Sequence, residues 1–398
     1  MEIAVIADDL TGAADTGVQL TRAGYRTAVA FREAEMPPAG ALDAVALDTD
    51  SRTMPLRTAR ERVSEAGGAV RDARIVYKKI DSTLRGHVAA EISAALEATG
   101  RERAVVAPAF PASGRTTVGG VQLVHGVPVH ETEMRNDPRT PVREGHIPTL
   151  LAESFPSVET LSVEDLADPA SARRTIEDAG CVVADAVRDG DLEALVRVVP
   201  DPSDVLWTGS AGLAGALGAV YPGSHVGATP ASTPARAVVV VIGSLSGVAR
   251  DQLRGLVEEY GEVAVPVEAR RDGVVEKTAE AARRVLSEKA CVILHSPEKR
   301  DPSGGAGPVV TTLAKVAARL SKRGLFDALV LTGGSTAVGV ARRLGASGIR
   351  LEGEVEAGVP VGTLIGNSPY RVVTKAGGFG RSDTLVRAVE MLLDNGKD

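Results

Sequence analysis

Short apolar runs alternate along this chain with longer segments whose apolar residues recur at helical spacing. Residues 3–7, 44–47 and 104–107 are apolar runs of strand length, while 11–23 and 88–96 carry the spacing of helices with one buried face. Strands and helices that follow one another in this way are typical of an α/β fold. We therefore expect sheets with helices packed on them.

One segment breaks this rhythm. Residues 222–236 are rich in Pro, Gly, Ser, Thr and Ala and show no periodicity, as expected of an interdomain connection. The length of 398 residues also favours about two domains. We predict an N-terminal domain over 1–222, a linker over 223–236 and a C-terminal domain over 237–398. The strand–helix rhythm continues throughout, which predicts two doubly wound, Rossmann-like domains with a ligand cleft between them.

In the first half, charged side chains come directly after the predicted strands. Asp8 and Asp9 follow the run 3–7, and Arg52 lies shortly after the run 44–47. Ligands of open α/β sheets bind beyond the carboxyl ends of the strands, so these side chains are candidates for a site. Paired carboxylates can hold hydroxyls, bind Mg²⁺ through water or supply a general base, and an arginine can pair with an acid. The structural alternative is that Asp9 only caps the next helix.

The densest cluster of charge lies at residues 78–87, which read Lys-Lys-Ile-Asp-Ser-Thr-Leu-Arg-Gly-His between a predicted strand and a predicted helix. Lys79, Arg85 and the free amides of the helix start suit an anionic small molecule. Asp81 can accept a proton or orient a hydroxyl. The structural alternative is that Asp81 or Ser82 only caps the helix.

A further candidate lies in the irregular loop after the fourth predicted strand, where Arg115 and two threonines suit an anion. The segment that follows, 119–143, is rich in Gly, Pro and polar residues, and a long loop of this kind is typical of a lid or an active-site wall. It contains His125 and His130. Two histidines at this spacing without a third ligand nearby argue against a zinc site.

In the second half, three predicted strands lead into glycine turns that precede helices, at Gly243, Gly333 and Gly377. Such turns expose backbone N–H groups, which suit phosphate groups. Neither a Walker A pattern nor Gly-x-Gly-x-x-Gly occurs in the sequence, so a nucleotide site here would be of another kind. Tight helix packing is the alternative explanation for a single turn of this type.

Composition narrows the function classes. With 44% hydrophobic, 24% charged and 3% aromatic residues, the chain fits a globular protein whose cores are built from Ala, Val, Leu and Ile. A formal net charge of −7 without a long basic run argues against a nucleic-acid partner. The absence of a long apolar window and of a leader pattern argues against a membrane partner and favours the cytoplasm. Cys181 and Cys291 begin apolar runs and are expected to be buried thiols.

Taken in order, these motifs resemble those of the four-carbon acid sugar kinases. The resemblance covers nearly the whole chain and rests on residues 7–15, 50–52, 78–86, 107–111, 114–115, 243–244, 332–337 and 375–380. Lys-Ile-Asp-Ser-Thr-Leu-Arg-Gly, residues 79–86, is its most specific signal. The last motif often reads Lys-Ser-Gly-x-Phe-Gly in that family, whereas this chain has Ala376 in place of the serine and so lacks that hydroxyl.

The resemblance implies an ATP-dependent kinase that phosphorylates the terminal hydroxyl of threonate, erythronate or 3-oxo-tetronate. The N-terminal domain would hold the sugar acid and the C-terminal domain the nucleotide. The expected catalytic residues are Asp8, Asp9, Asp81 and Arg85, with one of the three aspartates as the base. The expected substrate-binding residues are Asp8, Asp9, Arg52, Lys79, Asp81, Ser82, Arg85 and Arg115. The expected nucleotide-binding residues are Ser244, Gly333, Gly334, Ser335, Thr336, Ala376, Gly377, Gly378 and Gly380.

Mg²⁺ bridging the phosphates of ATP is the expected cofactor, with no protein ligands assigned to it. The expected partners are a small sugar acid and ATP, and a homodimer is a candidate assembly.

Two other function classes fit part of the pattern. A two-lobed sugar-acid sensor would not need the glycine turns, and an NAD-dependent dehydrogenase would need a dinucleotide fingerprint that the sequence lacks. The choice of tetronate and of the base is left open.

Overall fold

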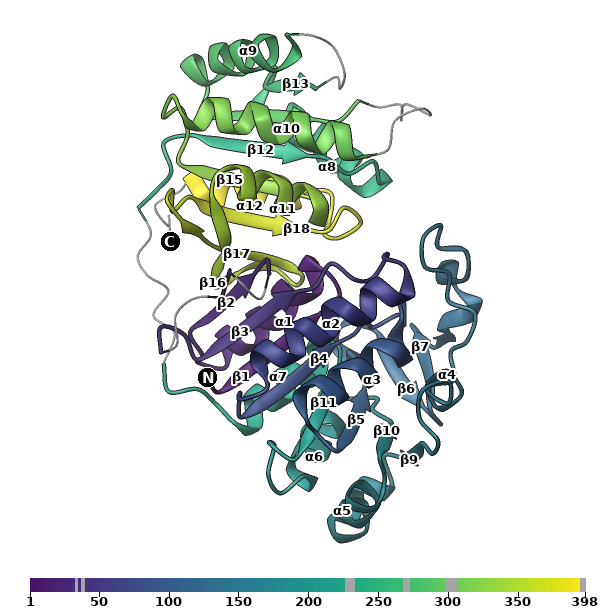
Figure 1. Cartoon of the computed structure of the whole chain (residues 1–398). Helices are drawn as coiled ribbons and strands as arrows, with labels where there is room; N and C mark the ends of the chain where they lie inside the picture. The colour runs from purple at the N-terminus through teal and green to yellow at the C-terminus, as the bar shows by residue number, and fades with distance from the viewer. Residues whose placement is uncertain (33–34, 37–39, 226–232, 268–272, 298–305, 394–398) are drawn as a thin grey trace. The chain divides into compact units, whose positions relative to one another are not determined.

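The computed structural model describes residues 1–32, 35–36, 40–225, 233–267, 273–297 and 306–393. The chain divides into two compact units, Met1–Gly227 and Ala228–Asp398, which Figure 1 shows along the colour gradient. Part of the predicted linker, 226–232, lies outside the described residues, and the predicted boundaries stay a prediction. No helix in the described part of the chain combines the length and the apolar character needed to cross a bilayer.

The sheet of the first unit is parallel, and its strands lie in the order β2, β3, β1, β4, β11, β5, β10, β9. Their bounds are β1 (Ile3–Ala7), β2 (Thr27–Ala30), β3 (Ala44–Asp48), β4 (Ile75–Lys79), β5 (Arg103–Ala107), β9 (Glu159–Leu161), β10 (Cys181–Ala184) and β11 (Val205–Gly209). Apart from the edge strand β9, these strands are mostly buried and rich in Ala, Val and Ile, as a sheet covered on both faces requires.

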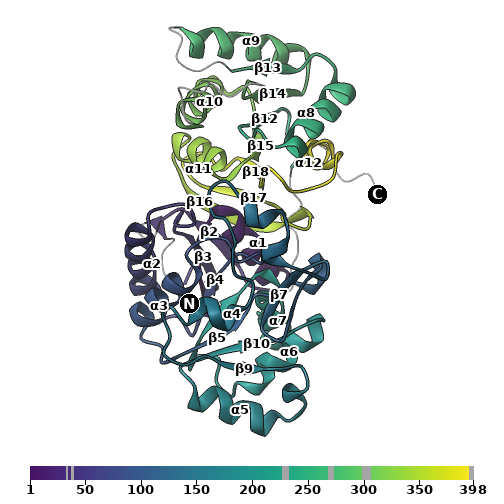
Figure 2. The same ribbon diagram turned by 90° about the vertical axis from the view of Figure 1, so that its right-hand side faces the viewer.

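Helices cover both faces of this sheet. Their bounds are α1 (Leu10–Arg22), α2 (Leu56–Val70), α3 (Val88–Thr99), α4 (Ile147–Leu151), α5 (Pro169–Asp178), α6 (Asp189–Val198) and α7 (Ala211–Val220). In Figure 2, α2 and α3 lie together on one side, and α1 and α7 on the other. Strand β1 is followed by α1, on the side of α1 and α7. Its neighbours β3 and β4 are followed by α2 and α3, on the opposite side. The chain therefore changes direction at β1, where such sheets open a crevice beyond the strand ends.

The predicted long loop at 119–143 is wrong in its first part. Three antiparallel strands, β6 (Arg115–Val118), β7 (Val121–Val124) and β8 (Val127–Pro128), form a small separate sheet there. Gly119 and Gly120 make the first turn with φ of 57° and 72°, a conformation that glycine adopts without strain. Short helical turns, η3 (Val129–Glu131) and η4 (Glu133–Asn136), follow.

The sheet of the second unit has the order β13, β14, β12, β15, β18, β17, β16. Its strands are β12 (Val238–Ile242), β13 (Ala264–Pro266), β14 (Cys291–His295), β15 (Ala328–Thr332), β16 (Ala346–Glu356), β17 (Val359–Gly366) and β18 (Arg371–Lys375). Its helices are α8 (Gly247–Tyr260), α9 (Val274–Glu288), α10 (Ala306–Ser321), α11 (Gly334–Arg343) and α12 (Thr384–Leu393). Helices α9, α10 and α11 pack on one side and α8 and α12 on the other, so this unit is doubly wound as predicted (Figure 2).

The prediction of an unbroken strand–helix rhythm is wrong between α11 and β18. Strands β16 and β17 form an antiparallel hairpin there, and β17 also pairs antiparallel with β18. The hairpin turns at Gly358, whose φ is 77°. The prediction for the cysteines is confirmed: Cys181 and Cys291 are free and buried, and burial raises the pKa of each thiol to about 12.

The last-but-one residue of β4, Lys78, forms a buried ion pair with α3. Lys78 Nζ is 2.8 Å from Glu91 Oε2 of α3, and the two side chains are 0% and 3% exposed. Lys78 Nζ also donates to the carbonyl oxygen of Lys79 at 2.9 Å. The pair thus fixes the last residues of β4 against the helix that follows the charged motif.

We predict that Glu91→Leu lowers the free energy of unfolding of the first unit by about 3–5 kcal/mol, because it leaves a buried ammonium uncompensated. The double variant Lys78→Met/Glu91→Leu should recover most of that loss. Urea unfolding followed by the fluorescence of Trp207, the only tryptophan of the chain, reports on this unit. Glu193→Leu is the matched control, since its pair with Arg197 is solvent-exposed. Equal losses in the two leucine variants would contradict the prediction.

Candidate functional site

Two adjacent carboxylates at the end of β1 share one guanidinium. Arg52 Nε and Nη2 lie 2.7 and 2.9 Å from the Asp8 oxygens, and Nη1 and Nη2 lie 2.7 and 2.9 Å from the Asp9 oxygens. The loop after β3 brings Arg52 there because the N–H groups of Ser51 and Arg52 both donate to the carbonyl of Asp8, at 2.9 and 3.1 Å. Arg52 thus joins the ends of β1 and β3.

A second pair lies beside the first. Arg85 Nε and Nη2 are 2.7 and 3.2 Å from the Asp81 oxygens, and Thr83 Oγ1 also donates to Asp81. Arg52 Nη2 is 3.9 Å from Asp81 Oδ1, which links the two pairs. On its other side, Arg85 Nη1 is 3.7 Å from Asp137 Oδ2. The structure therefore brings together five of the predicted site residues, Asp8, Asp9, Arg52, Asp81 and Arg85, from the segments that follow β1, β3 and β4.

The motif between β4 and α3 makes a tight turn to bring this about. Leu84 is buried with φ of 60°, an unusual value for a bulky residue, and its N–H donates to the carbonyl of Asp81 at 2.9 Å. Gly86 follows with φ of 99°, and a Cβ there would lie 3.3 Å from Arg52 Cγ. The turn places the guanidinium of Arg85 against the carboxylate of Asp81. It requires glycine at position 86 because the backbone there lies close to Arg52.

Lys79 approaches the same cluster from β4. It is 4% exposed, and its Nζ donates to the carbonyl of Ile80 at 2.9 Å. A Cβ on Gly12 of α1 would lie 2.9 Å from this Nζ and 2.8 Å from Asp9 Oδ1. The amine and the carboxylate therefore border the same small space, which a glycine keeps open.

The three aspartates differ in their tendency to hold a proton. Burial alone would raise the pKa of Asp8, but the charge and hydrogen bonds of Arg52 hold it below its usual range. Burial and the charge of Asp8 raise the pKa of Asp9 in spite of Arg52. For Asp81, the charges of Arg52 and Arg85 outweigh burial and lower its pKa. Carboxylates whose pKa values are pushed apart in this way are suited to separate roles in catalysis.

The two capping alternatives have different outcomes. Asp9 does cap α1, since its Oδ1 accepts the N–H of Gly12 at 2.7 Å. Neither Asp81 nor Ser82 caps α3: the N-cap position of that helix is His87, which makes no capping hydrogen bond with its side chain. Asp9 therefore caps α1 and also accepts hydrogen bonds from Arg52. Asp81 instead accepts hydrogen bonds from Arg85 and does not cap a helix.

Within the part of the chain that the structure describes, Arg115 makes no ion pair with the aspartates of this cluster. It lies on β6 and donates to the carbonyl of Ser113.

Gln122 of β7, which the sequence did not single out, connects this strand to the charged motif. It is fully buried, donates from Nε2 to the carbonyl of Ser82 at 2.7 Å and accepts from Thr117 Oγ1 at 2.7 Å. Apolar residues on both sides of Gln122, after two glycines, are the hairpin signal that could have revealed it.

In the second unit, three glycine turns meet at the ends of neighbouring strands. Gly243 N donates to the last carbonyl of β15 at 3.2 Å, and Gly333 N donates to the carbonyl of Lys375 at 2.8 Å. Ser246 Oγ donates to the carbonyl of Gly377 at 2.5 Å. Turns that lie far apart in the sequence are therefore adjacent in space.

Two hydroxyl side chains pack against the glycines of these turns. A Cβ on Gly377 would collide with Ser244 Oγ, and one on Gly243 would collide with Thr336 Oγ1, so only glycine permits this close approach. The other predicted nucleotide-binding residues lie on the same turns: Gly334, Ser335, Ala376, Gly378 and Gly380. Backbone N–H groups and hydroxyls of this density suit phosphate oxygens.

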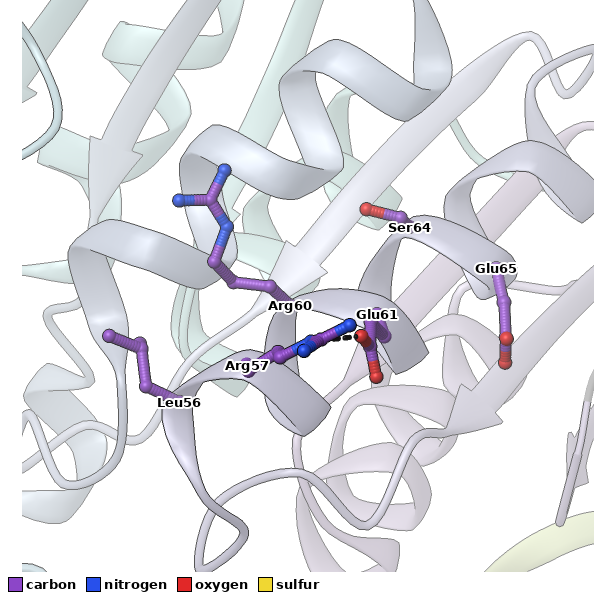
Figure 3. A pocket seen from close by; sticks show the side chains of 6 residues that line it. All are labelled: Leu56, Arg57, Arg60, Glu61, Ser64 and Glu65. Carbon is purple, nitrogen blue, oxygen red and sulfur yellow. Dashed lines mark hydrogen bonds and ion pairs between the residues drawn. The ribbon is translucent and has the colours of Figure 1, made fainter.

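A cavity of about 590 Å³ lies on α2 and not at either cluster (Figure 3). It is lined by Leu56, Arg57, Arg60, Glu61, Ser64 and Glu65. Arg57 Nε and Glu61 Oε1, one turn apart on α2, form an ion pair of 2.8 Å. None of the predicted site residues borders this cavity. Within the described ranges, no three or more His, Cys, Asp or Glu side chains are grouped to hold a metal ion.

Asp48, at the end of β3, has an unusual carboxyl group. It is 6% exposed and accepts the N–H of Asp50 at 2.9 Å. Burial raises its pKa to about 8, and the charges of Asp9, Asp50 and Asp8 add to the rise, while the Asp50 hydrogen bond opposes it. Asp48 therefore keeps its proton in the folded protein at pH values where the unfolded chain, with a pKa of 3.8, has released it.

This proton makes the stability of the first unit depend on pH. Because the folded state binds it up to about pH 8, the free energy of unfolding should fall as pH rises from about 4 to about 8. In Asp48→Asn this fall should be shallower, by up to about 1.4 kcal/mol per pH unit. Urea unfolding across this range measures the slope, with the exposed Asp72→Asn as the control. Parallel curves for Asp48→Asn and the wild type would contradict the assignment.

Two family models match the chain. One is described as a sugar-binding N-terminal domain and covers residues 3–217, and the other as a nucleotide-binding C-terminal domain and covers residues 239–385. Among solved structures, a Haemophilus influenzae protein of the DUF1537 family is 23% identical with a TM-score of 0.78, over 98% of this chain and 100% of that one, which supports the fold. A DUF1537 protein from Bordetella bronchiseptica, described as a domain-swapped dimer with bound citrate, is 38% identical with a TM-score of 0.52 and 98% of both chains covered.

Curated relatives carry names of one enzyme class. A D-threonate kinase from Bordetella bronchiseptica is 38% identical over 98% of this chain and 97% of the relative. A D-erythronate kinase from Heliobacterium modesticaldum is 30% identical over 98% and 97%. A 3-oxo-tetronate kinase from Methylobacterium radiotolerans is 31% identical over 98% and 99%. With both domains matched and these relatives aligned over nearly their full length, the chain belongs to the ATP-dependent four-carbon acid sugar kinases.

Proposed function

We propose that this kinase transfers the terminal phosphoryl group of ATP to the terminal hydroxyl of D-threonate. Three relatives named D-threonate kinase are 35–38% identical to the chain, whereas the D-erythronate kinase and the 3-oxo-tetronate kinase described above are 30% and 31% identical. The observation that carries the proposal is the cluster of Asp8, Asp9, Asp81, Arg52 and Arg85, which offers acceptors for hydroxyls beside cations for a carboxylate.

The contacts support separate roles for the two arginines. Arg52 makes four hydrogen bonds to Asp8 and Asp9, which leaves one of its five N–H donors. Its role is to hold the two carboxylates in position. Arg85 is 27% exposed and keeps Nη1 only loosely engaged, so Arg85 and Lys79 are the groups that bind the carboxylate of the acid or the transferred phosphoryl.

Asp9 is the best candidate for the base. Its side chain is 28% exposed, against 4% for Asp8 and 12% for Asp81, so a substrate hydroxyl can reach it. Its raised pKa also brings it closer to neutral pH, where a general base works best. It would accept the proton of the terminal hydroxyl as that oxygen attacks phosphorus.

ATP use is a property of the family, and the glycine turns of the second unit are the proposed site for its phosphates. Mg²⁺ would supply charge neutralisation on those phosphates. Asp8, Asp9 and Asp81 are engaged by arginines, so they fit hydroxyl binding better than a metal cage. The hydroxyls of Ser244 and Thr336, adjacent to the glycines of the turns, are compatible with a phosphate-bound ion.

The Bordetella structure supports two further proposals. Its bound citrate is a carboxylic acid, as expected if this fold binds organic acids. Its description as a domain-swapped dimer supports a homodimer for this chain as well. Light scattering after size-exclusion chromatography gives the assembly directly.

ADP release from Mg·ATP should occur with D-threonate and be much slower with L-threonate, D-erythronate and 3-oxo-tetronate. In Asp81→Asn, which loses the ion pair with Arg85, turnover should fall about a hundredfold or more. A coupled ADP assay on the panel measures both, with Asp72→Asn as the surface control. Faster turnover of another acid of the panel would show that D-threonate is not the preferred substrate. Binding of an acid without any turnover would favour the two-lobed sensor.

Asp9→Asn should lower kcat by about 10²–10⁴-fold, the usual contribution of a general base. Asparagine caps helices as well as aspartate does, so the start of α1 should stay intact and thermal unfolding should change little. Single-turnover measurement of phosphoryl transfer checks the loss. Full activity of Asp9→Asn would move the base to Asp8 or Asp81.

A further inference from the structure

Strand β18 ends in a buried lysine without a carboxylate partner. Lys375 is 3% exposed, and its Nζ donates to the carbonyl of Ala376 at 2.9 Å. No carboxylate of the described residues lies within 4.0 Å of it. In the first unit, by contrast, the fully buried Lys78 is paired with Glu91. A buried, uncompensated ammonium is costly, so its presence needs an explanation other than packing.

The surroundings of Lys375 are those of an anion site. The carbonyl of Lys375 accepts the N–H of Gly333, and the next glycine turn is held by Ser246 at the start of α8. Helices α8 and α11 both begin at these turns without an acidic residue in the first turn, so their positive ends are uncompensated. The hydroxyl of Thr332, the last residue of β15, is fully buried and has no hydrogen-bond partner in the part of the chain that the structure describes.

The acidic group that acts on Lys375, Glu356, is engaged mainly by other partners. Glu356 of β16 accepts from Thr384 Oγ1, from Arg381 N at 3.3 Å and from Arg387 Nη1 at 2.9 Å. Arg381 Nε also lies 3.5 Å from Glu356 and 3.6 Å from Asp383. Glu356 is thus shared among the groups that start α12.

The first turn of helix α8 has no acidic residue, and Glu258 and Glu259 lie in its last turn. Its Asp251 is exposed and pairs with Arg254. Its Arg250 donates to the carbonyls of Ser296 and Pro297 at 3.2 and 2.6 Å. The balance of charge around Lys375 is therefore positive.

We propose that Lys375 binds the polyphosphate of ATP, which supplies the negative charge that the protein does not. An ammonium has three donors, and one is used by Ala376, so two remain for phosphate oxygens. The lysine would neutralise charge during phosphoryl transfer without forming a covalent bond. This inference rests on the proposed placement of ATP at the glycine turns.

Proton uptake on binding tests the inference in the wild-type protein. Burial lowers the pKa of Lys375 to about 8, although the charge of Glu356 opposes the shift. A bound polyphosphate favours the charged amine and raises that pKa. At pH near 8, ATP binding should therefore take up about half a proton, and affinity should weaken as pH rises to about 9. Calorimetric titration of Mg·ATP into the full chain, without sugar acid, in two buffers of different ionisation enthalpy measures the uptake.

Three variants separate a ligand-directed lysine from a structural one. Lys375→Met should abolish the uptake and weaken ATP binding about tenfold to a hundredfold, while the midpoint of thermal unfolding stays equal or rises. Lys375→Arg should bind ATP with little change between about pH 7 and 9, because arginine stays charged. Lys289→Met, at an exposed position, should behave as the wild type.

The outcomes distinguish this inference from the nucleotide site itself. ATP binding without proton uptake, unchanged in Lys375→Met, would overturn the role of the lysine and leave the kinase assignment intact. A wild-type protein that binds no ATP would overturn the inference together with the site on which it rests. A lower unfolding midpoint for Lys375→Met with unchanged ATP affinity would identify a structural lysine.

Discussion

The geometry of the first unit depends on one guanidinium that serves two carboxylates. Asp8 and Asp9 stand side by side at the end of a buried strand, where two negative charges would repel each other and lose their hydration. Arg52 removes this conflict by donating to both, and it reaches them because the backbone of its own loop is bonded to Asp8. The same arginine lies 3.9 Å from Asp81, so the ends of three strands are held by one residue. At this proposed site a substrate would therefore meet acceptors that are already ordered, which would lower the entropic cost of positioning it.

The two units balance charge to different degrees, and the difference fits their proposed ligands. In the first unit, Arg52, Arg85 and Lys78 each have a carboxylate partner, and Lys79 borders the same small space as the carboxylate of Asp9. A sugar acid carries a single negative charge and several hydroxyls, so a nearly balanced site with many acceptors suits it. In the second unit, the glycine turns offer N–H groups, and Lys375 lacks a carboxylate among the described residues. ATP carries several negative charges, and a site with an unbalanced positive charge suits it in turn.

The sequence predicts the strand ends well because each buried strand is a short apolar run and the charged residues of the cluster lie at its end or within a few residues of it. It does not predict that Arg52 reaches both Asp8 and Asp9, since this depends on β3 and β1 being neighbours. Strand order is a property of the whole sheet, and local periodicity carries little information on it. The small sheet that contains Gln122 escaped prediction because Gly, Pro and His residues obscure its short alternating strands. The hairpin of β16 and β17 was missed because β16 mixes buried and exposed positions without a regular alternation.

The charge pattern of the first unit also bears on the choice among tetronates. Threonate and erythronate offer hydroxyl donors at every carbon between the ends, whereas 3-oxo-tetronate replaces one hydroxyl by a carbonyl that can only accept. Carboxylates such as Asp9 and Asp81 are acceptors when ionised, and the arginines keep Asp81 ionised. A site that binds hydroxyls through buried carboxylates discriminates strongly against an analogue that lacks the hydroxyl, because the carboxylate is then left without its partner. We therefore expect the acceptors of this cluster to exclude the 3-oxo acid, and the walls of the site to separate threonate from erythronate by shape. In this proposal the first selection is electrostatic and would be made by the carboxylates at the three strand ends.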